Sequence, residues 1–582
     1  MMKRLCFTLV AAAAVLCAQG DPRGAIFGHV SDPAAAFVAG AKVKVTNTLT
    51  NVTTELMTNE QGYYEAPLLV AGTYKVEVNA AGFKGATRPA FDLPAGSRLE
   101  VDFRLEIGTL SDSVTVSDAP PLLNTDNASA GLVLDRQNVR ELPWPGGNPM
   151  MLVWMAPGAQ TSLSISDYSQ RLHSGGPANN VNINGKVGGN EFTVDGASNN
   201  ANGRGVGFNP APEFVQAVKV ETSGFDASFG HSTGASITMM TNSGTNQFHG
   251  VLREMHEQYK WRAADLFVKQ GYYTRIAQAE AAGDKAAADA IRKTSPLQPG
   301  RENSYAASIG GPIIIPKLFN GKDKLFFFYG FAGFRVGEYR QSYYQFPTED
   351  MRNGNFSQLL NINANQYQIY DPLSTIADAS RPGHVVRTPF AGNMVPQSRI
   401  INPAYSWMRG YLPKPNAVGA PNVEPSRNFN AYSYPYQEKF DSHVNRFDYN
   451  ISSSDRVFFR WSYNRWQNQN PNWQYYTDSA NIWQGAGQIR TNYGQALDWV
   501  HNFGTSTLLD VAVSSNMYKQ ENITPAASTL TPSAVGYPTY LDQKVAGAPN
   551  LPAVNWSGWT GFSLPASPSN TKYRVLSFKA DL

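Results

Sequence analysis

Apolar and polar side chains alternate along much of the chain, and this alternation predicts β-strands. The clearest run is Leu99–Ile107, in which every second residue is apolar and the residues between are charged. A period of two buries one face of a strand and leaves the other face wet. Turn pairs such as Gln61-Gly62 and Ala81-Gly82 separate the runs in this part of the chain. We therefore expect a β-sandwich of about seven strands over residues 22–108.

A region rich in Gly and Asn follows at residues 122–246 and has short elements of mixed type. Its strongest strand patterns are Phe192–Val194, Phe214–Glu221 and Ser236–Thr241. These patterns are shorter and less regular than those on either side, so they predict a mixed α/β domain between two β-rich regions.

From residue 247 onward, several alternating runs have the length of a transmembrane β-strand, about 9–11 residues. Examples lie at residues 304–309, 446–451, 459–464 and 509–514. One face of such a strand would meet lipid and the other a polar lumen. A strand of a soluble sandwich has the same pattern, so the runs alone leave both possibilities open.

The lengths of the connections separate these two possibilities. Short or moderate connections at 310–324, 452–455 and 504–506 alternate in strict order with long ones at 260–302, 336–437, 468–489 and 520–570. Outer-membrane barrels have short turns at one end and long loops at the other, whereas a sandwich has no reason to keep this order. We expect about eight strands of an antiparallel transmembrane β-barrel over residues 247–582. A helix is expected at Ile276–Arg292, within the first long loop.

The first residues have the pattern of a cleaved secretory signal. A basic pair precedes the apolar run Leu5–Leu16, and a site of small residues ends at Gly20. The run is too short for a membrane anchor, and the bulky Leu16 before Cys17 argues against a lipoprotein. We expect residues 1–20 to be removed on export.

Composition narrows the possible functions. Aromatic residues make up 12% and charged residues 16% of the chain, and the net charge is +3. Nothing here indicates the concentrated basic face of a protein that binds nucleic acid. The two cysteines, Cys6 and Cys17, lie in the expected signal. The exported chain therefore has no thiol for a disulfide, a metal site or nucleophilic catalysis.

Three motifs resemble catalytic or ligand sites but have simpler explanations. Ser232 lies in a G-x-S-x-G motif, yet a strand pattern follows where a nucleophile elbow needs a helix. The glycines between residues 203 and 207 lack the Lys-Ser/Thr of a phosphate loop. His249 and His256 are too far apart for a zinc pair. We expect no catalytic residue, no metal site and no cofactor, in a protein that is not an enzyme.

Five short segments of the first β-rich region occur in a familiar order: Gly24–Val30, Gly40–Val43, Gly62–Tyr64, Gly72–Val76 and Ala80–Phe83. In this order they resemble the carboxypeptidase regulatory-like domain. The resemblance implies a transthyretin-like, carbohydrate-binding-like β-sandwich. It implies no peptidase activity, because the catalytic domain of that family is a separate unit.

A second resemblance covers the rest of the chain. A strand ending in Asp195-Gly196, the segment Glu213–Gly230 and the segment Thr241–Gly250 together resemble the plug of TonB-dependent receptors, and Gly310–Tyr329 is similar to their Oar-like members. The resemblance implies an outer-membrane receptor with its plug and sandwich on the periplasmic side. It implies the TonB–ExbB–ExbD complex, outer-membrane lipid and the barrel-assembly machinery as partners. The implied function is uptake of a large ligand such as a siderophore, cobalamin or an oligosaccharide.

The linker at residues 109–121 contains a short strand pattern that ends at prolines. Such a strand cannot easily continue in a sheet and could add to the edge of a partner's sheet. Its position before the plug resembles that of a TonB box, which implies TonB contacts at Ser113, Val114, Thr115, Val116 and Ser117. A last strand of the sandwich and a plain linker remain the alternatives.

The loop Asn199–Phe208 of the expected plug combines polar and aromatic side chains. We expect ligand contacts there at Asn199, Asn200, Asn202, Arg204 and Phe208. Fold alone cannot choose the ligand, although the carbohydrate-binding-like sandwich is a mild hint towards a glycan. The rival interpretation is an outer-membrane adhesion or carbohydrate-binding surface protein that transports nothing.

The expected fold is mainly β: a sandwich, a mixed α/β plug and a partial antiparallel transmembrane β-barrel. About eight strands are recognisable where receptors of this kind have about 22. The end of the chain, Lys579–Leu582, lacks the usual terminal aromatic residue. Because a barrel cannot leave an open edge in lipid, we expect a truncated gene product, a fragment or the first part of a split gene.

Overall fold

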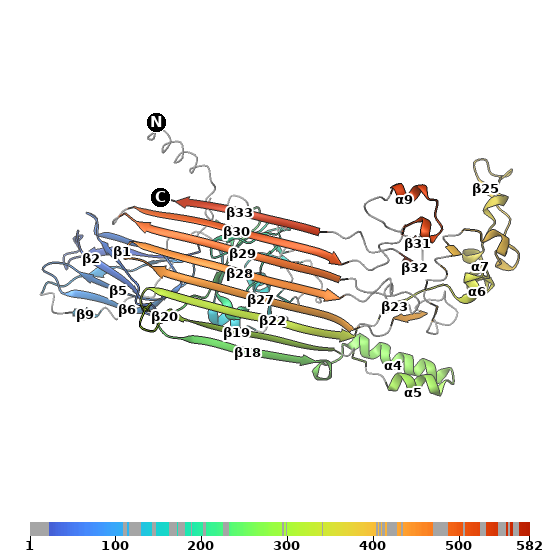
Figure 1. Ribbon diagram of the computed structural model, residues 1–582, viewed down its shortest axis with the longest axis horizontal. Helices are drawn as coiled ribbons and strands as arrows, with labels where there is room; N and C mark the ends of the chain where they lie inside the picture. The colour runs from blue at the N-terminus through green and yellow to red at the C-terminus, as the bar shows by residue number, and fades with distance from the viewer. Residues whose placement is uncertain are drawn as a thin grey trace.

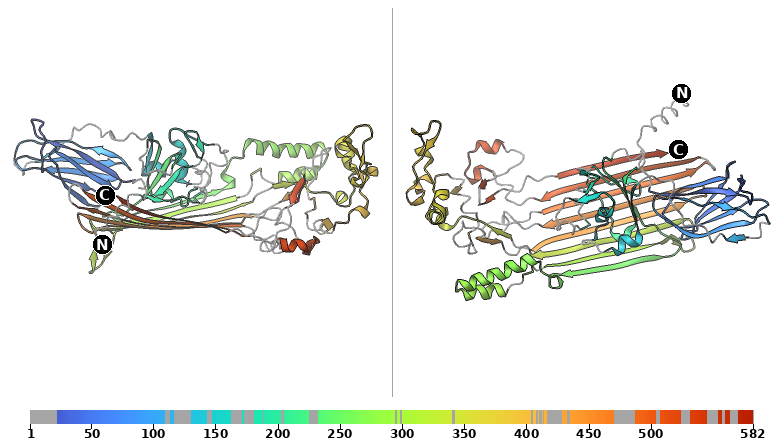
Figure 2. Two further views of the ribbon diagram at one scale, coloured as in Figure 1. Left: turned by 90° about the horizontal axis from the view of Figure 1, so that it is seen from above. Right: turned by 180° about the vertical axis from the view of Figure 1, so that it is seen from behind.

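The computed structural model has three parts (Figure 1). An N-terminal β-sandwich lies at one end of a long eight-stranded sheet, and a central domain packs on one face of that sheet (Figure 2). The described residues are 22–581 without 109–112, 116–129, 143–146, 162–170, 173–180, 188, 202–204, 225–231, 294–295, 298–299, 340–341, 403–404, 407–408, 410–411, 413, 416–427, 432–434, 470–486, 504–506, 524–530, 545–553, 557–558 and 563–569. The expected signal at residues 1–20 lies outside them.

Two sheets form the sandwich. The first consists of β1 (Gly24–Ser31), β4 (Tyr63–Leu69), β7 (Arg98–Glu100) and β8 (Phe103–Arg104). The second, in the order β3-β2-β5-β6-β9, consists of β2 (Lys42–Asn47), β3 (Thr53–Met57), β5 (Gly72–Asn79), β6 (Gly85–Leu93) and β9 (Ser113–Thr115). Val43, Val76 and Leu99 are among the alternating side chains buried between the two sheets.

The run Leu99–Ile107 alternates as expected but does not form one continuous strand. The chain pairs with β1 through β7 and again through β8. Between them, the Asp102 side chain accepts the N–H of His29 (2.7 Å) in place of a backbone carbonyl. A local side-chain hydrogen bond of this kind competes with the sheet ladder.

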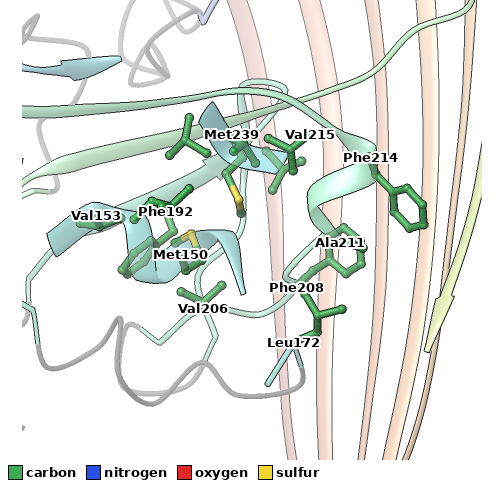
Figure 3. Packing of buried hydrophobic residues seen from close by; sticks show 14 of the residues in the cluster. Met150, Val153, Leu172, Phe192, Val206, Phe208, Ala211, Phe214, Val215 and Met239 are labelled. Atoms are coloured by element: carbon green, nitrogen blue, oxygen red, sulfur yellow. The ribbon is translucent and has the colours of Figure 1, made fainter. Parts of the chain in front are cut away.

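The central domain is a mixed α/β unit. Its larger sheet, in the order β10-β16-β17-β14-β15, consists of β10 (Ala130–Asp135), β16 (Val215–Ser223), β17 (Ser236–Thr241), β14 (Glu191–Val194) and β15 (Ala197–Ser198). The other elements are β11 (Ala159–Thr161), β12 (Val181–Ile183), β13 (Lys186–Val187), α2 (Arg136–Glu141), η2 (Pro149–Met155) and η5 (Pro212–Phe214). Figure 3 shows its core, where Met150, Phe192, Phe208 and Met239 pack together.

The eight-stranded sheet is antiparallel throughout. In spatial order its strands are β18 (His249–Gln258), β19 (Gly300–Pro312), β22 (Leu325–Tyr339), β27 (Pro435–Asn450), β28 (Asp455–Gln469), β29 (Gly487–Asn502), β30 (Leu508–Ile523) and β33 (Asn570–Asp581). The sheet is curved but open, with β18 and β33 at its two edges. The expectation of a mainly β protein with these three parts is confirmed.

The connections alternate in length as the sequence indicates. Short turns, such as residues 451–454, lie at the end of the sheet next to the sandwich, and so does the hairpin of β20 (Ile314–Ile315) and β21 (Phe319–Asn320) (Figure 1). The long connections lie at the opposite end, which we call the loop end. They contain α4 (Leu266–Ala281), α5 (Lys285–Arg292), α6 (Glu349–Arg352), α7 (Ser357–Tyr367), α9 (Tyr540–Lys544), β23 (Ser342–Tyr344), β24 (Ile376–Ala377), β25 (Val385–Val386), β26 (Phe429–Ala431), β31 (Val554–Trp556) and β32 (Trp559–Phe562).

The helix expected at Ile276–Arg292 is two helices, α4 and α5. Gly283 interrupts it with φ of +74°, a conformation that suits glycine. The Asp284 side chain then accepts the N–H of Ala287 (2.9 Å) and begins the second helix. Among the helices that the structure describes, none is long and apolar enough to cross a membrane.

Candidate functional site

The two faces of the eight-stranded sheet have different surroundings. Alternate side chains of β22, including Phe326, Phe328 and Phe334, are buried on the side of the central domain, and those between them face away. Phe328 meets Phe214 of the central domain edge-on, with ring centroids 6.2 Å apart. Gly330 lies under the same ring, where an added Cβ would come within 2.6 Å of Phe214 Cε1. The central domain therefore contacts the sheet through close apolar packing.

Asp195 is the centre of a buried charged cluster between the two parts. It lies in the tight turn between β14 and β15, with φ of +47°. Its carboxylate accepts the N–H (2.8 Å) and the hydroxyl (2.7 Å) of Thr241. It also pairs with Arg446 Nη1 of β27 (3.0 Å) and with Arg460 Nη1 of β28 (3.2 Å). One carboxylate of the central domain therefore joins two neighbouring strands of the sheet.

This cluster is stable only while it is complete. The side chains of Asp195, Arg446 and Arg460 are at most 6% exposed, and Arg446 also pairs with Asp448 (2.8 Å). Removing one member of a buried ion pair typically costs about 3–5 kcal/mol, because the remaining charge is left without a partner. In the sequence, Asp195 is recognisable only as part of the Asp195-Gly196 pair that resembles a plug motif. The signal for its role is an acidic residue at the end of an apolar strand, directly before glycine.

Arg171 forms a second cluster with three strands of the sheet. Its guanidinium lies 2.8 Å from Glu302 of β19, 3.3 Å from Glu338 of β22 and 3.4 Å from Glu438 of β27. Burial lowers the pKa of Arg171, but the hydrogen bond to Glu302 and the three carboxylate charges raise it above its usual range. Arg171 therefore stays charged and draws three strands toward one point of the central domain.

Two further ion pairs surround this interface. Glu213 of the central domain pairs with Arg253 Nε of β18 (2.6 Å). Arg23, at the start of the sandwich, pairs with Asp498 (3.1 Å) and Asp510 (2.7 Å) on β29 and β30. The sandwich, like the central domain, is therefore attached to the sheet by ion pairs.

A cavity of about 110 Å³ lies where the three parts meet. Its walls include Arg23 of the sandwich, Asp195 of the central domain and Arg456 of the sheet. The wall of the cavity is mainly apolar but includes these charged groups, and the cavity has room for a few water molecules. Charged groups at this interface can therefore be hydrated when they separate, which lowers the cost of parting them.

The segment expected to contact TonB lies on the sandwich. Ser113, Val114 and Thr115 form β9, which pairs in parallel with Gly85–Thr87 of β6. Val116 and Ser117 lie outside the described residues. In the structure, residues 113–115 therefore form a last strand of the sandwich, which was the alternative to a free TonB-binding segment. Because β9 ends the order of its sheet, its second edge has no neighbour among the described strands.

The residues expected to contact a ligand are buried or lie outside the described residues. Asn199 is 3% and Phe208 is 2% exposed. The Asn199 side chain donates to the Phe208 carbonyl (2.7 Å) and accepts its N–H (2.9 Å), which ties the two ends of the loop together. Asn200 accepts the N–H of Phe192 (3.2 Å), and residues 202–204 are not described. Ligand contact by these residues stays a prediction and requires the loop to open.

Two other groups bear on chemistry. Ser232 donates its hydroxyl to the Ala235 carbonyl (2.9 Å) in the turn before β17, so a strand follows it as the sequence indicates. Within the described residues, one group places possible metal-ligand atoms within 4.8 Å of one another: His29, Glu100 and Asp102 on the sandwich. This group cannot be recognised from the sequence, because His29 is distant along the chain from Glu100 and Asp102. Exposed carboxylates often meet in this way without an ion.

Comparisons with known proteins agree with this architecture. The family model described as outer membrane beta barrel domain matches residues 240–582, and the carboxypeptidase regulatory-like domain matches residues 25–106. The chain is 30% identical over 304 residues to a TonB-dependent transporter, Oar, of Myxococcus xanthus, which covers 50% of this chain and 25% of the relative. The chain thus spans about a quarter of the length of that relative.

Solved structures of outer-membrane transporters are also similar. The transporter YddB of Escherichia coli aligns with a TM-score of 0.39 at 12% identity, over 68% of this chain and 39% of its own. The siderophore receptor PirA of Acinetobacter baumannii aligns with a TM-score of 0.35 at 12% identity, over 78% of this chain and 45% of its own.

Proposed function

This chain belongs to the outer membrane β-barrel domain family, and from this we propose that it acts in an outer-membrane receptor for TonB-driven uptake of a large ligand. The central domain is the plug, and the eight-stranded sheet is the barrel wall on which it packs. The loop end faces the outside, and the sandwich lies in the periplasm. Siderophores, cobalamin and oligosaccharides are the candidate ligands.

The observation that carries the proposal is the ionic attachment of the plug to the wall. Asp195, Arg171 and Glu213 each pair with charged side chains of the sheet. Buried ion pairs hold a plug firmly while water is excluded, yet separated charges regain hydration. Such an interface suits a plug that closes the wall at rest and rearranges when it is pulled.

TonB would supply the pull through the segment 113–117. Strand addition to a free sheet edge uses backbone hydrogen bonds and is a common way to bind a peptide segment. One edge of β9 has no neighbour among the described strands, and TonB would pair there. A force applied to β9 acts on the connection that leads directly into β10 of the plug. Ligand binding at the loop end and force at the sandwich end would then act on the two sides of the plug.

The test is an in-frame deletion of residues 113–117 in the gene of the host cell. Growth is measured with ferric siderophore, cobalamin or an oligosaccharide as the limiting nutrient. We expect growth on one of these nutrients to be lost, with an unchanged amount of protein in the outer membrane. A deletion of equal length at residues 124–128, in the same connection, is the control. Unchanged uptake after the first deletion would remove the proposed TonB contact.

The rival function, adhesion without transport, depends on the same outer loops. The loop between β22 and β27 is folded around Asn393, which is fully buried and accepts the N–H of Ile369 (2.7 Å). A preformed loop of this kind could hold a glycan or a protein as well as a transported ligand. Altered adhesion with normal uptake after gene deletion would favour the rival.

A further inference from the structure

The face of the sheet that is turned away from the plug has an uncharged band. Cross-strand pairing aligns Phe327, Phe447, Phe459, Leu497, Val513 and Phe578 in one row. The paired rows on both sides of it, on the same face, hold no charged residue. A band of this kind is the part of an outer-membrane strand that meets hydrocarbon.

Toward the loop end the same face becomes basic. In the three cross-strand rows of Phe331, Gly333 and Arg335, six cations lie on five strands: Arg335, Lys439, Arg465, Lys519, Lys572 and Arg574. Asp441 pairs with Arg335 (2.8 Å), and Glu521 pairs with Lys519 (2.7 Å). The other four cations form no ion pair with the residues that the structure describes.

The depth of the outermost of these cations, Arg335 and the opposite Lys439, matches that of lipid headgroups. Leu325, in the first uncharged row, and Arg335 are ten residues apart on β22. For a strand tilted by about 40° this is about 25 Å along the membrane normal, the height of the apolar band of such barrels. Tyr463 and Tyr493, which lie in the same cross-strand row as Arg574, pack with ring centroids 5.1 Å apart. Aromatic girdles of this kind lie at the level of the headgroups.

A counter-charge would stabilise the arrangement of the cations. Arg335 is directly opposite Lys439 on the neighbouring strand, and Lys519 is directly opposite Lys572. Like charges in opposite positions destabilise a sheet. Asp441 pairs with Arg335 and also lies directly opposite Arg465, and Glu521 pairs with Lys519. Lys439 and Lys572 are therefore each left opposite a like charge without an ion pair to a described residue. An anion from outside the chain would neutralise the remaining cations.

We propose that this basic belt binds the phosphate groups of lipid in the outer leaflet. The belt is defined by Lys439, Arg465, Lys572 and Arg574. Lys439 and Arg465 make one contact site on β27 and β28, and Lys572 and Arg574 make another on β33. Arg binds phosphate through parallel N–H groups, and Lys binds it as a point charge. A lipid headgroup brings phosphate to this depth without leaving the membrane, whereas free phosphate would have to enter the headgroup layer. The assignment to the outer leaflet depends on the orientation proposed above.

The test uses the full chain, extracted from outer membranes in mild detergent and incubated with lipid A. Lipid A retained per protein is measured by mass spectrometry. We expect the pair K439Q/R465Q to reduce retention about tenfold, and K572Q/R574Q to do the same. The control K317Q/K322Q removes two lysines from the turn at the sandwich end and should change nothing. The exchange K439R/R465K keeps both charges and should keep retention, which separates loss of charge from loss of fold.

Three results would overturn the proposal. If the protein retains dephosphorylated lipid A as well as it retains lipid A, the belt does not recognise phosphate. If a variant with all four cations replaced retains as much lipid A as the wild type, the belt is not the binding site. Equal retention of phosphatidylglycerol would overturn the assignment to outer-leaflet lipid. The experiment measures lipid binding and not uptake, so a negative result would not contradict the proposed receptor function.

Discussion

Asp195 of the central domain and Arg446 of the eight-stranded sheet are 251 positions apart in sequence, yet their side chains form a buried ion pair of 3.0 Å. The backbone of the turn at Asp195 sets the direction of the carboxylate, and Thr241 supplies two further hydrogen bonds. The pair therefore joins two elements that are far apart in the sequence.

The substitution Asp195→Asn removes the charge but keeps the size of the side chain. Because Arg446 and Arg460 would lose their shared carboxylate, we expect the plug–wall interface to lose about 3–5 kcal/mol. Limited proteolysis of the chain in outer membranes measures the exposure of the plug. The control Asp92→Asn changes an exposed carboxylate of the sandwich. Equal protease resistance of D195N and the wild type would contradict the role of Asp195.

The substitution Arg171→Leu leaves three carboxylates facing one another. We expect a loss of about 3 kcal/mol in stability, because the charge that Glu302, Glu338 and Glu438 share is removed. Adding Glu302→Gln and Glu338→Gln should recover part of this loss. The midpoint of urea unfolding, measured for all combinations, gives the coupling between these sites. Strict additivity would show that Arg171 acts independently of the carboxylates.

Gly330 should not tolerate a side chain. Its Cβ would lie 2.6 Å from the Phe214 ring, and overpacking of this kind costs about 1–3 kcal/mol. Gly330→Ala is therefore expected to lower the unfolding midpoint. Gly337→Ala is the matched control on the same strand, because no atom lies within 4 Å of its added Cβ. Equal effects of the two substitutions would show that Phe214 does not pack closely at this point.

Because the pKa of Tyr63 is raised, we expect the sandwich to lose stability at alkaline pH. Burial, followed by its hydrogen bond to Glu65 (2.7 Å), raises the pKa of Tyr63 to about 12. Because the folded-state pKa is above the value of 10.0 for a free tyrosine, the stabilisation is fully present below pH 10 and is lost as pH rises toward 12. Ultraviolet difference titration of Tyr63→Phe against the wild type should show a missing transition near pH 12. A missing transition near pH 10 would contradict the raised pKa.

The sequence by itself determined the type and order of the elements. Alternation with a period of two specifies a strand and its two faces within a few neighbouring residues. The order of short and long connections specified the antiparallel sheet and the end at which the loops lie. Such signals are local, so they can be read without knowing which segments meet. A local signal was also missed at Gly283, where a turn between two Ala-rich segments divides the expected helix.

Only the tertiary structure decided which residues meet across these elements. Sequence alone does not pair Asp195 with Arg446 or place Arg171 among three glutamates, because an ion pair depends on distance in space and leaves no periodic pattern. The loop of Asn199 and Phe208 has the composition of a ligand-binding loop, but its side chains satisfy one another inside the plug. Strand β9 has the pattern of a free segment, yet it pairs with β6 because that sheet edge is within reach. Periodicity thus fixed which face of each strand is buried, and packing between distant segments fixed what each face contacts.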